Sequence, residues 1–439
     1  MYGGGTFLTQ NKILPGTYIN YVSVAKASSV VSDRGVAAMA INMDWGPVGK
    51  IFKVEQEDFQ TTPEKYFGHA YTDDEMKGLR DLFLNLKTGY FFRLNGGGAS
   101  AECDYCTAKY GGTAGNKIMV VIYANADDTG KWDVETYFDG TLMDIQTGVA
   151  TLAELKDNDF VTWKDDGAIA ETAGTDLTGG TNGSAATGTT HSTFLGLLES
   201  YSFNILGCLS TDATVKSLYY TYVKRMRDDE GAKFQVVLYD FSNADYEGCI
   251  NVCTPSTDSV FGESALVYWV TGAEANCAVN ANIGNNIYDG EFGMTVKTKQ
   301  SDLKAQLAKG QLVFHSVNGG DYKVMSDINS FTSFTNQKKS DFGSNQAIRV
   351  LDQIGNDCAL MFAKTYMNIE DNDTPGRTAL WNDLCDYSKK LQTLRAIQNF
   401  DTADITVERG ETAKDVLVSY YVEPTLAMEK MYMYVYVRE

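Results

Sequence analysis

Hydrophobic and polar residues follow two different periods along this chain, and the period changes several times between its ends. The stretch "MYMYVYV" (Met431–Val437) alternates at every second position, with Tyr on one side and Met or Val on the other. This period predicts a β-strand. Neither side is charged, so both sides require cover, and an unpaired strand at a chain end offers its backbone N–H and C=O groups to other chains.

The first 90 residues combine strand and helix patterns. "TYINYVSV" (Thr17–Val24) follows Pro15-Gly16 and predicts a strand. "TDDEMKGLRDLFLNLKTG" has apolar residues at helical spacing and predicts a helix. We expect Thr72 to cap this helix, Glu75 to complete a capping box and Gly89 to suit its end.

Between residues 90 and 190 the pattern changes to short strands and turns. "YFFRLN", "KIMVVIYA", "WDVETYFDG" and "TLMDIQTG" each predict a strand, so we expect an all-β module. It ends in "AGTDLTGGTNGSAATGTT" (Ala173–Thr190), which has almost no apolar content. Such a composition predicts a flexible linker or an exposed loop.

The next region alternates helices with short apolar strands. "TFLGLLES", "TDATVKSLYYTYVKRMRDDEG" and "ALVYWVTGAEANCAVNANIG" predict helices, and Gly231 ends the second. "FNILGCLS" and "FQVVLYD" predict buried strands, which indicates a parallel sheet. "GQLVFHSVNGGDYKVMSDIN" predicts a hairpin around Asn318-Gly319-Gly320.

Two long helices and a strand-rich tail complete the pattern. In "SNQAIRVLDQIGNDCALMFAKTYMNI" the apolar residues line one face, and in "TPGRTALWNDLCDYSKKLQTLRAIQNF" we expect Thr374 to cap and Pro375 to occupy the first turn. The chain after Asp401 predicts strands only. Because proline interrupts a β-ladder, Pro15 and Pro424 are expected to separate outer strands from the domain body.

Composition and charge narrow the classes of partner. Of the 439 residues 44% are hydrophobic and 21% charged, as in ordinary globular proteins, and the net charge is −20. This charge argues against nucleic acid or an anionic membrane as the main partner. There is no run of about 18 apolar residues, and the first residues lack the pattern of a secretion signal. We therefore expect no membrane insertion.

The eight cysteines predict buried thiols in a reducing compartment, because several lie in apolar runs. The one C-x-x-C motif, Cys103–Cys106, lacks a second pair and nearby histidines, whereas zinc requires four ligands. Zinc or redox chemistry at this pair stays an open alternative.

Motifs for catalysis or cofactor binding are absent from the sequence. The three histidines, His69, His191 and His315, show no metal-binding spacing, and no nucleophile elbow occurs. "GGTAGNKI" departs from a phosphate-binding loop at Asn116 and Ile118. We therefore predict no catalytic, cofactor-binding or metal site. A cytosolic α/β hydrolase with an appended β module is the alternative, and a surface-layer or adhesin protein is a third.

Five segments carry a resemblance to a known family, and they occur in the family's order. They are "LPGTYINYVSV", "DRGVAAMAINMDWGP", "YVKRMRDDEGAKFQVVL", the helix pair, and "GETAKDVLVSYYVEPTLAMEKMYMYVYV". The chain resembles the tail sheath protein of contractile phage tails, in the form found in phages and phage-tail-like bacteriocins of Gram-positive bacteria. The resemblance runs nearly end to end and is densest in the first 50 and last 100 residues.

The resemblance implies a multidomain α+β fold. It consists of a β-sandwich module, an α/β domain of subtilisin-like topology without catalysis, and an α/β C-terminal domain with extended terminal β-arms. The expected ranges are 1–24 for the N-terminal arm and strand, 25–90 for the first part of the body, 91–190 for the β-sandwich, 191–343 for the α/β domain, 344–424 for the helix pair and strands, and 425–439 for the C-terminal arm.

The resemblance also implies a function and its partners. Family sheaths form stacked hexameric rings around an inner tube, contract, and drive the tube through a cell envelope. Expected partners are further copies of the chain, the inner tail tube protein, and baseplate and tail terminator proteins, without nucleic acid or cofactor. The expected place is a virion tail or phage-tail-like particle assembled in the host cytoplasm.

Neighbouring sheath subunits are joined by exchanged terminal strands, and this predicts the roles of particular residues. The exchanged strands would contain Thr17, Tyr18, Ile19, Asn20, Tyr21 and Val22 at one end and Met431, Tyr432, Met433, Tyr434, Val435, Tyr436 and Val437 at the other. The hinges would be Pro15, Gly16, Glu423 and Pro424. The alternative is that both terminal strands pair within one chain.

A locally basic helix is the candidate contact with an acidic tube surface. Residues 375–399 carry Arg377, Lys389, Lys390 and Arg395 within a chain of strongly negative charge. The alternative is an ordinary solvated face, because the four cations do not form a single stripe.

Overall fold

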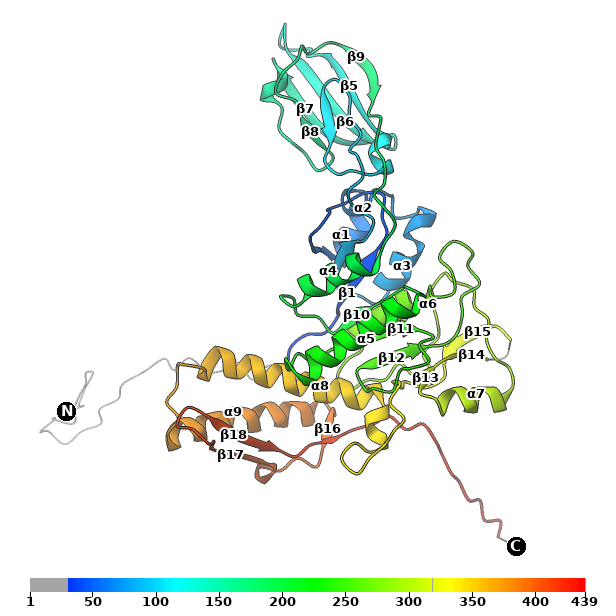
Figure 1. Ribbon diagram of the computed structural model, residues 1–439, viewed down its shortest axis with the longest axis vertical. Helices are drawn as coiled ribbons and strands as arrows, with labels where there is room; N and C mark the ends of the chain where they lie inside the picture. Colours follow the sequence, from blue (N-terminus) through cyan, green and yellow to red (C-terminus); the bar gives the residue numbers. More distant parts are fainter. Residues whose placement is uncertain (1–30, 318, 439) are drawn as a thin grey trace, which may run out of the picture.

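The computed structural model describes residues 31–317 and 319–438, and these residues form three parts in a row. A β-sandwich lies at one end of the row, an α/β domain in the middle and a C-terminal domain at the other end (Figure 1). A last segment of chain extends away from the C-terminal domain (Figure 1). The residues predicted for the N-terminal strand and hinge, 15–24, lie outside the described residues.

The α/β domain is built on one seven-stranded sheet in the order β13-β12-β11-β10-β1-β3-β2. All neighbouring strands are parallel except β2, which pairs antiparallel with β3 at the edge. The strands are β1 (Val36–Ile41), β2 (Phe52–Glu55), β3 (Thr88–Arg93), β10 (Ile205–Gly207), β11 (Gln235–Tyr239), β12 (Cys249–Val252) and β13 (Gln311–Leu312). The predicted parallel sheet is confirmed, with β10, β11 and β12 fully buried.

The sheet corrects two of the expected boundaries. The segment "YFFRLN" was expected in the β module, but β3 pairs with β1 from Val36↔Thr88 to Ile41↔Arg93. The ranges 25–90 and 191–343 were expected as separate parts, but β1 pairs with both β3 and β10. The α/β domain is therefore one discontinuous unit, and the β-sandwich is inserted between β3 and α4.

Helices cover both faces of this sheet. On one face α3 (Lys77–Phe83) and α6 (Leu266–Asn276) pack in a common core with Met39 and Ile250. On the other face α4 (Gly188–Leu198) and α5 (Ala213–Asp228) pack against Leu206 and Val236. Shorter helices complete the domain, namely α1 (Gln56–Thr61), α2 (Pro63–Phe67) and α7 (Gln300–Leu307), and the predicted hairpin forms from β14 (Phe314–Val317) and β15 (Asp321–Val324).

The start and end of the helix near residue 80 differ from the prediction. A 3₁₀ turn, η1 (Asp74–Met76), precedes α3, and Thr72 does not cap either element. The Asp73 carboxylate instead accepts from the backbone N–H of Ala70 at 2.9 Å, which closes the loop before the helix. The helix ends at Phe83, and Gly89 lies in β3 because the strand begins at Thr88.

The β-sandwich module contains a four-stranded sheet in the order β7-β6-β5-β9 and a β4–β8 pair. Its strands are β4 (Cys106–Ala108), β5 (Ile118–Ala124), β6 (Trp132–Phe138), β7 (Thr141–Val149), β8 (Val161–Trp163) and β9 (Thr172–Asp176). The Gly/Thr-rich stretch is not a free linker. Its first residues belong to β9, which pairs with β5. Near its end, the Thr187 side chain accepts from the Thr190 N–H and so caps α4.

The C-terminal domain packs two helices against two small sheets. It contains α8 (Asn345–Met361), continued by one π-helical turn (Phe362–Tyr366), and α9 (Thr374–Thr393). Strands β17 (Ile405–Arg409) and β18 (Val416–Tyr420) form a hairpin, and β16 (Ile397–Gln398) pairs with β19 (Glu423–Pro424). Asp373, and not Thr374, caps α9, because its carboxylate accepts from the Gly376 N–H at 2.8 Å.

Candidate functional site

The outer part of the C-terminal arm, residues 431–437, leaves the body after a short anchored stretch. The Thr425 N–H donates to the Ala396 carbonyl at 2.9 Å, and the Ala427 N–H donates to Gln346 Oε1 at 3.0 Å. The Ser326 hydroxyl reaches Glu429 Oε1 at 3.1 Å. Beyond this point the arm points away from the body (Figure 1).

Apolar side chains of the arm are exposed on both of its faces. The exposed fractions from Met431 to Val437 lie between 69% and 89%. The arm forms no ladder with any of the described residues, so the strand predicted from its alternation is not formed with them. With respect to these residues its backbone donors and acceptors stay available between two rows of apolar side chains.

The predicted hinge at Glu423 and Pro424 lies in a paired strand. In the β16–β19 ladder Pro424 is opposite Ile397 and Glu423 is opposite Gln398. The Glu423 carboxylate also accepts from the side-chain amides of Gln398 and Asn399 at 2.6 and 2.9 Å. These bonds join both residues to the C-terminal domain, and their role as a hinge stays a prediction.

The four cations predicted to face a tube do not form one site. Arg377, in the first turn of α9, is half-buried and donates to the backbone and side-chain oxygens of Asn372 at 3.0 Å. Lys389, Lys390 and Arg395 are exposed at the opposite end of the helix, where Lys389 pairs with Asp386 at 3.4 Å. Three of the four cations thus lie at or just after the end of α9, and the fourth lies in its first turn.

Sequence reasoning missed a buried charge cluster that joins α8 to the α/β domain. Arg349 pairs with Glu274 at 2.5 Å and with Asp327 at 3.2 Å, and all three side chains are at most 1% exposed. Asn345 donates to both carboxylates, at 3.0 and 2.8 Å. We call these four residues the Arg349 cluster.

The Arg349 cluster contains two carboxylates for one guanidinium. Burial, followed by the negative charge of Asp327, raises the pKa of Glu274 from its usual 4.5 to about 8. Burial lowers the pKa of Arg349, but the nearby Cys277, Glu274 and Asp327 outweigh it and raise this pKa above its usual value. The guanidinium therefore stays charged, while Glu274 holds a proton over much of the neutral range.

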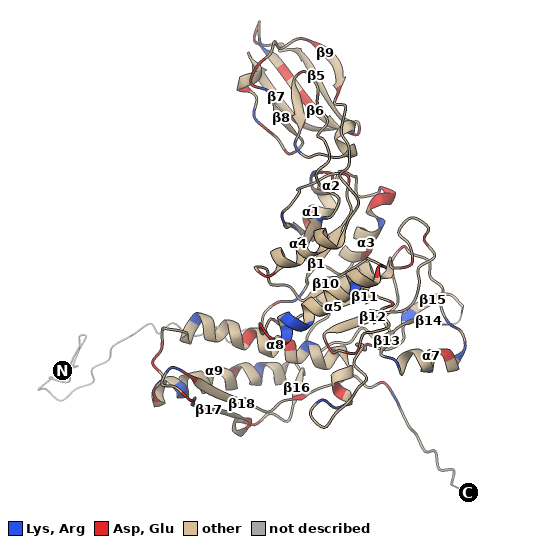
Figure 2. Ribbon diagram, viewed as in Figure 1, with Lys and Arg blue, Asp and Glu red and all other residues tan. Residues whose placement is uncertain are grey.

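Two further polar contacts are made by α8, whose ribbon carries charged residues of both signs between α5 and α9 (Figure 2). Arg227 of α5 forms a two-bond pair with Asp352, at 2.5 and 2.7 Å. Asp357 accepts from the Tyr387 hydroxyl of α9 at 2.8 Å. The signal was present in the sequence, because residues 345, 349, 352, 353 and 357 share one helical face. A polar face is normally assigned to solvent, and here it is buried.

Two of the three histidines have hydrogen-bond partners in the described part of the chain. His69 bonds to Asp44 at 2.8 Å, and His191 bonds to the Tyr219 hydroxyl at 3.0 Å. The sulfur atoms of Cys103 and Cys106 are 3.7 Å apart, and their contact lowers the pKa of Cys103 to about 6. Burial raises the pKa of Cys208, Cys249 and Cys277 to about 12, as expected for inert thiols.

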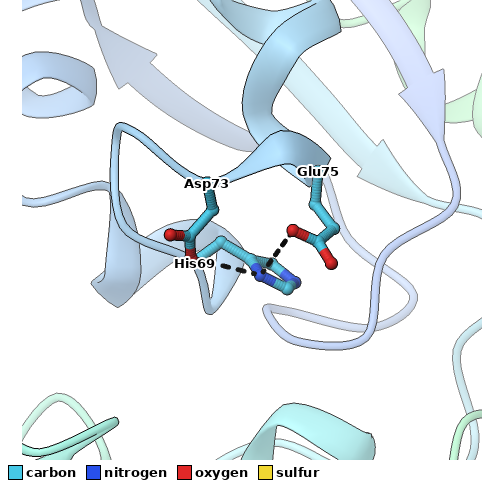
Figure 3. A group of neighbouring side chains, drawn as sticks. All are labelled: His69, Asp73 and Glu75. Carbon is cyan, nitrogen blue, oxygen red and sulfur yellow. Dashed lines mark ion pairs between the residues drawn. The ribbon is translucent and has the colours of Figure 1, made fainter.

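Within the described residues, one group of His, Cys, Asp or Glu side chains is close enough to share an ion. It consists of His69, Asp73 and Glu75 (Figure 3). Among the described residues the Cys103–Cys106 pair has no third His, Cys, Asp or Glu side chain close enough to share an ion with it. None of the helices in this part of the chain combines the length and hydropathy needed to cross a bilayer.

Three family models match the chain in succession. The phage tail sheath protein beta-sandwich domain matches residues 95–182, the phage tail sheath protein central domain matches 184–330, and the phage tail sheath C-terminal domain matches 337–438. These ranges follow the order of the β-sandwich, the α/β domain and the C-terminal domain along the chain.

Individual relatives cover nearly the whole chain. The phage-like element PBSX protein XkdK of Bacillus subtilis is 30% identical, over 98% of each chain. The solved sheath tail protein of Desulfitobacterium hafniense is 34% identical, with a TM-score of 0.79 over 95% of this chain and 99% of the other. That of Listeria innocua is 30% identical, with a TM-score of 0.80 over 92% and 94%.

The fold is also shared with a more distant assembly. The helical sheath of the anti-feeding prophage in its contracted state has a TM-score of 0.56 at 12% identity, over 97% of this chain and 99% of the other. At this identity the likeness concerns the fold alone.

Proposed function

This chain belongs to the phage tail sheath protein family, and from that premise we propose that it polymerises into stacked hexameric rings around an inner tail tube and contracts to drive the tube through a cell envelope. The protein is a structural component of a phage tail or tail-like particle. The observation that carries the proposal is the arm, an alternating apolar segment that is exposed and pairs with none of the described residues.

The arm is proposed to add a strand to a sheet in a neighbouring subunit. A strand gains ladder hydrogen bonds in this way, and its side chains gain cover on both faces. Each ladder bond contributes on the order of 1 kcal/mol net, and buried apolar area about 25 cal/mol per Å². The alternation of Tyr with Met and Val sets the register, because a slip by one residue exchanges the two faces. The partner strand is proposed to be Thr17–Val22 of the neighbour.

Contraction is proposed to move the bodies while the exchanged strands stay paired. The anchored stretch Thr425–Glu429 holds the base of each arm to its own C-terminal domain. Movement then concentrates near Lys430, and contacts between bodies rearrange before ladder bonds break. Baseplate, tail terminator and tube proteins are the proposed partners, and the α/β domain is proposed to have a subtilisin-like topology without catalysis.

Removing residues 431–439 tests this function. The deletion keeps the anchored stretch, so we expect the protomer to melt within about 2 °C of the full chain while striated cylinders disappear from electron micrographs. Tyr434→Pro should act similarly by removing one ladder donor, and Tyr434→Phe is the matched control that retains the donor and the apolar ring. Full-length cylinders formed by the deleted chain, measured by sedimentation and microscopy, would show that the arm does not join subunits.

A further inference from the structure

The loop between α2 and α3 brings one histidine and two carboxylates together. Helix α2 ends at Phe67, and the next residue, Gly68, has a left-handed backbone with φ 74°. A Cβ at this position would lie 2.4 Å from the Cβ of Trp45, so glycine allows the close turn that directs His69 inward. Asp73 and Glu75 follow on the same loop and on η1.

Interactions around the loop fix its shape. One guanidinium nitrogen of Arg80 donates to the carbonyls of Tyr71 and Asp73, both at 2.7 Å. The buried Met76 anchors η1 in the core of the α/β domain. The two carboxylates therefore project from a backbone that is held in place without an ion.

His69 presents a buried nitrogen with no hydrogen-bond partner. The residue is 8% exposed, and its Nε2 lies 2.8 Å from Asp44 Oδ1. When the neutral ring donates its Nε2–H to Asp44, its free lone pair lies on Nδ1. Nδ1 is buried and makes no hydrogen bond, and it faces Asp73 Oδ2 at 3.7 Å and Glu75 Oε2 at 3.8 Å (Figure 3).

These distances are too long for hydrogen bonds and suit ligands around an ion. A hydrogen bond from nitrogen to oxygen spans about 2.7–3.2 Å. An ion about 2.0–2.2 Å from each ligand holds neighbouring ligand atoms roughly 3–3.5 Å apart. All three ligand atoms lie within 4.8 Å of one another, so small side-chain rotations close the site.

We propose that His69 Nδ1, Asp73 and Glu75 bind a divalent first-row transition-metal cation, with Zn²⁺ as its probe. One imidazole and two carboxylates match the ligands of such ions. Asp44 acts as the outer partner that orients the imidazole. Asp44, His69 and Glu75 also line a cavity of about 260 Å³, which has space for water to complete the coordination.

The site lies where the α/β domain meets the β-sandwich. The Asp44 carbonyl accepts from the Ala114 N–H, and its carboxylate accepts from the Thr113 hydroxyl, both at 3.4 Å. Thr113 and Ala114 belong to the short helix η2 (Thr113–Lys117) of the sandwich module. A bound ion would therefore brace this junction, whether or not the subunits polymerise.

Calorimetric titration of Zn²⁺ into the full-length chain tests the site. The chain should carry Cys103→Ser and Cys106→Ser, because that thiol pair is a competing zinc ligand. We expect one equivalent to bind, and the melting temperature to rise with Zn²⁺ concentration. Asp44→Asn should weaken binding by about 10- to 100-fold, and Glu75→Gln at least as much.

Glu75→Gln is informative because the Glu75 side chain is exposed, so its replacement should not disturb folding. Glu57→Gln, at an exposed position on α1, is the matched control. Binding of Co²⁺ should give a visible absorption spectrum that His69→Gln abolishes, and circular dichroism of the apo variants checks their fold. Absence of a saturable single site would overturn the proposal in favour of an ion pair. So would equal binding by wild type, Glu75→Gln and His69→Gln.

Discussion

The polar face of α8 is buried, although polar side chains usually face solvent. The C-terminal arm shows the reverse, because its apolar side chains are exposed. On α8 the charged Arg349 is buried, together with Glu274 and Asp327. On the arm, aromatic and aliphatic side chains are exposed over seven consecutive residues. The charges have partners within the chain, whereas the described residues leave the apolar arm without any.

The two regions therefore have different roles: the buried charges of α8 stabilise the single protomer, whereas the exposed arm serves assembly. A buried charge network is costly unless every partner is present, so it favours one arrangement of α8 against the α/β domain. An exposed apolar strand gains free energy only when another strand covers it. Changes in the Arg349 cluster should therefore affect folding, and changes in the arm should affect polymers.

The largest expected effect on folding comes from removing the central cation. Arg349→Leu leaves the Asp327 carboxylate buried without its counter-charge, beside the protonated Glu274, so we expect a loss of about 3–5 kcal/mol in the free energy of unfolding. Urea unfolding of dilute, unassembled protomers measures it. Arg395→Leu, at an exposed position on the same domain, should change stability by less than about 0.5 kcal/mol. Equal effects of the two substitutions would show that the Arg349 cluster does not hold the domains together.

A smaller effect concerns pH. Since the pKa of Glu274 is raised to about 8, the folded protein binds more protons than the unfolded chain between about pH 4.5 and 8. The contribution of this group to stability is complete below pH 4.5 and is lost as the pH rises through 8. The slope is at most about 1.4 kcal/mol per pH unit.

Glu274→Gln should remove this slope, because a neutral amide replaces the protonated carboxyl and leaves Arg349 paired with Asp327. Urea unfolding at pH 5, 6.5 and 8 gives the comparison, with Glu408→Gln at an exposed position as the control. An unchanged slope in Glu274→Gln would assign the pH dependence to other groups.

The smallest effect is expected for charges that are exposed. Lys389→Glu with Lys390→Glu should weaken co-assembly with the tube at low salt, and by less at high salt, because exposed charges are screened. Cylinder formation by the sheath alone should not change. Lys304→Glu with Lys309→Glu on the α7 side is the matched control, and co-sedimentation with tube protein is the measurement. Equal co-assembly by both double variants would leave the basic end of α9 as an ordinary solvated surface.

The sequence by itself determined the elements whose pattern is local. Helical spacing gave α5 and its end near Gly231, and short apolar runs gave β10 and β11. The ordered segments of the family resemblance identified the sheath family, which the comparisons confirm. Such features can be predicted without a structure, because the hydrophobic period and the residues that form turns depend only on neighbouring positions in the sequence.

Only the tertiary structure decided what each face touches. Pairing of β1 with β10 joins segments more than 150 residues apart, and no local pattern encodes that choice. The caps expected at Thr72 and Thr374 are not formed, because the direction of a side chain depends on the other contacts of its loop. His69 meets Asp44, and the polar face of α8 meets buried carboxylates, for the same reason. A periodic pattern states which side chains share a face, and the fold alone supplies the partner that buries it.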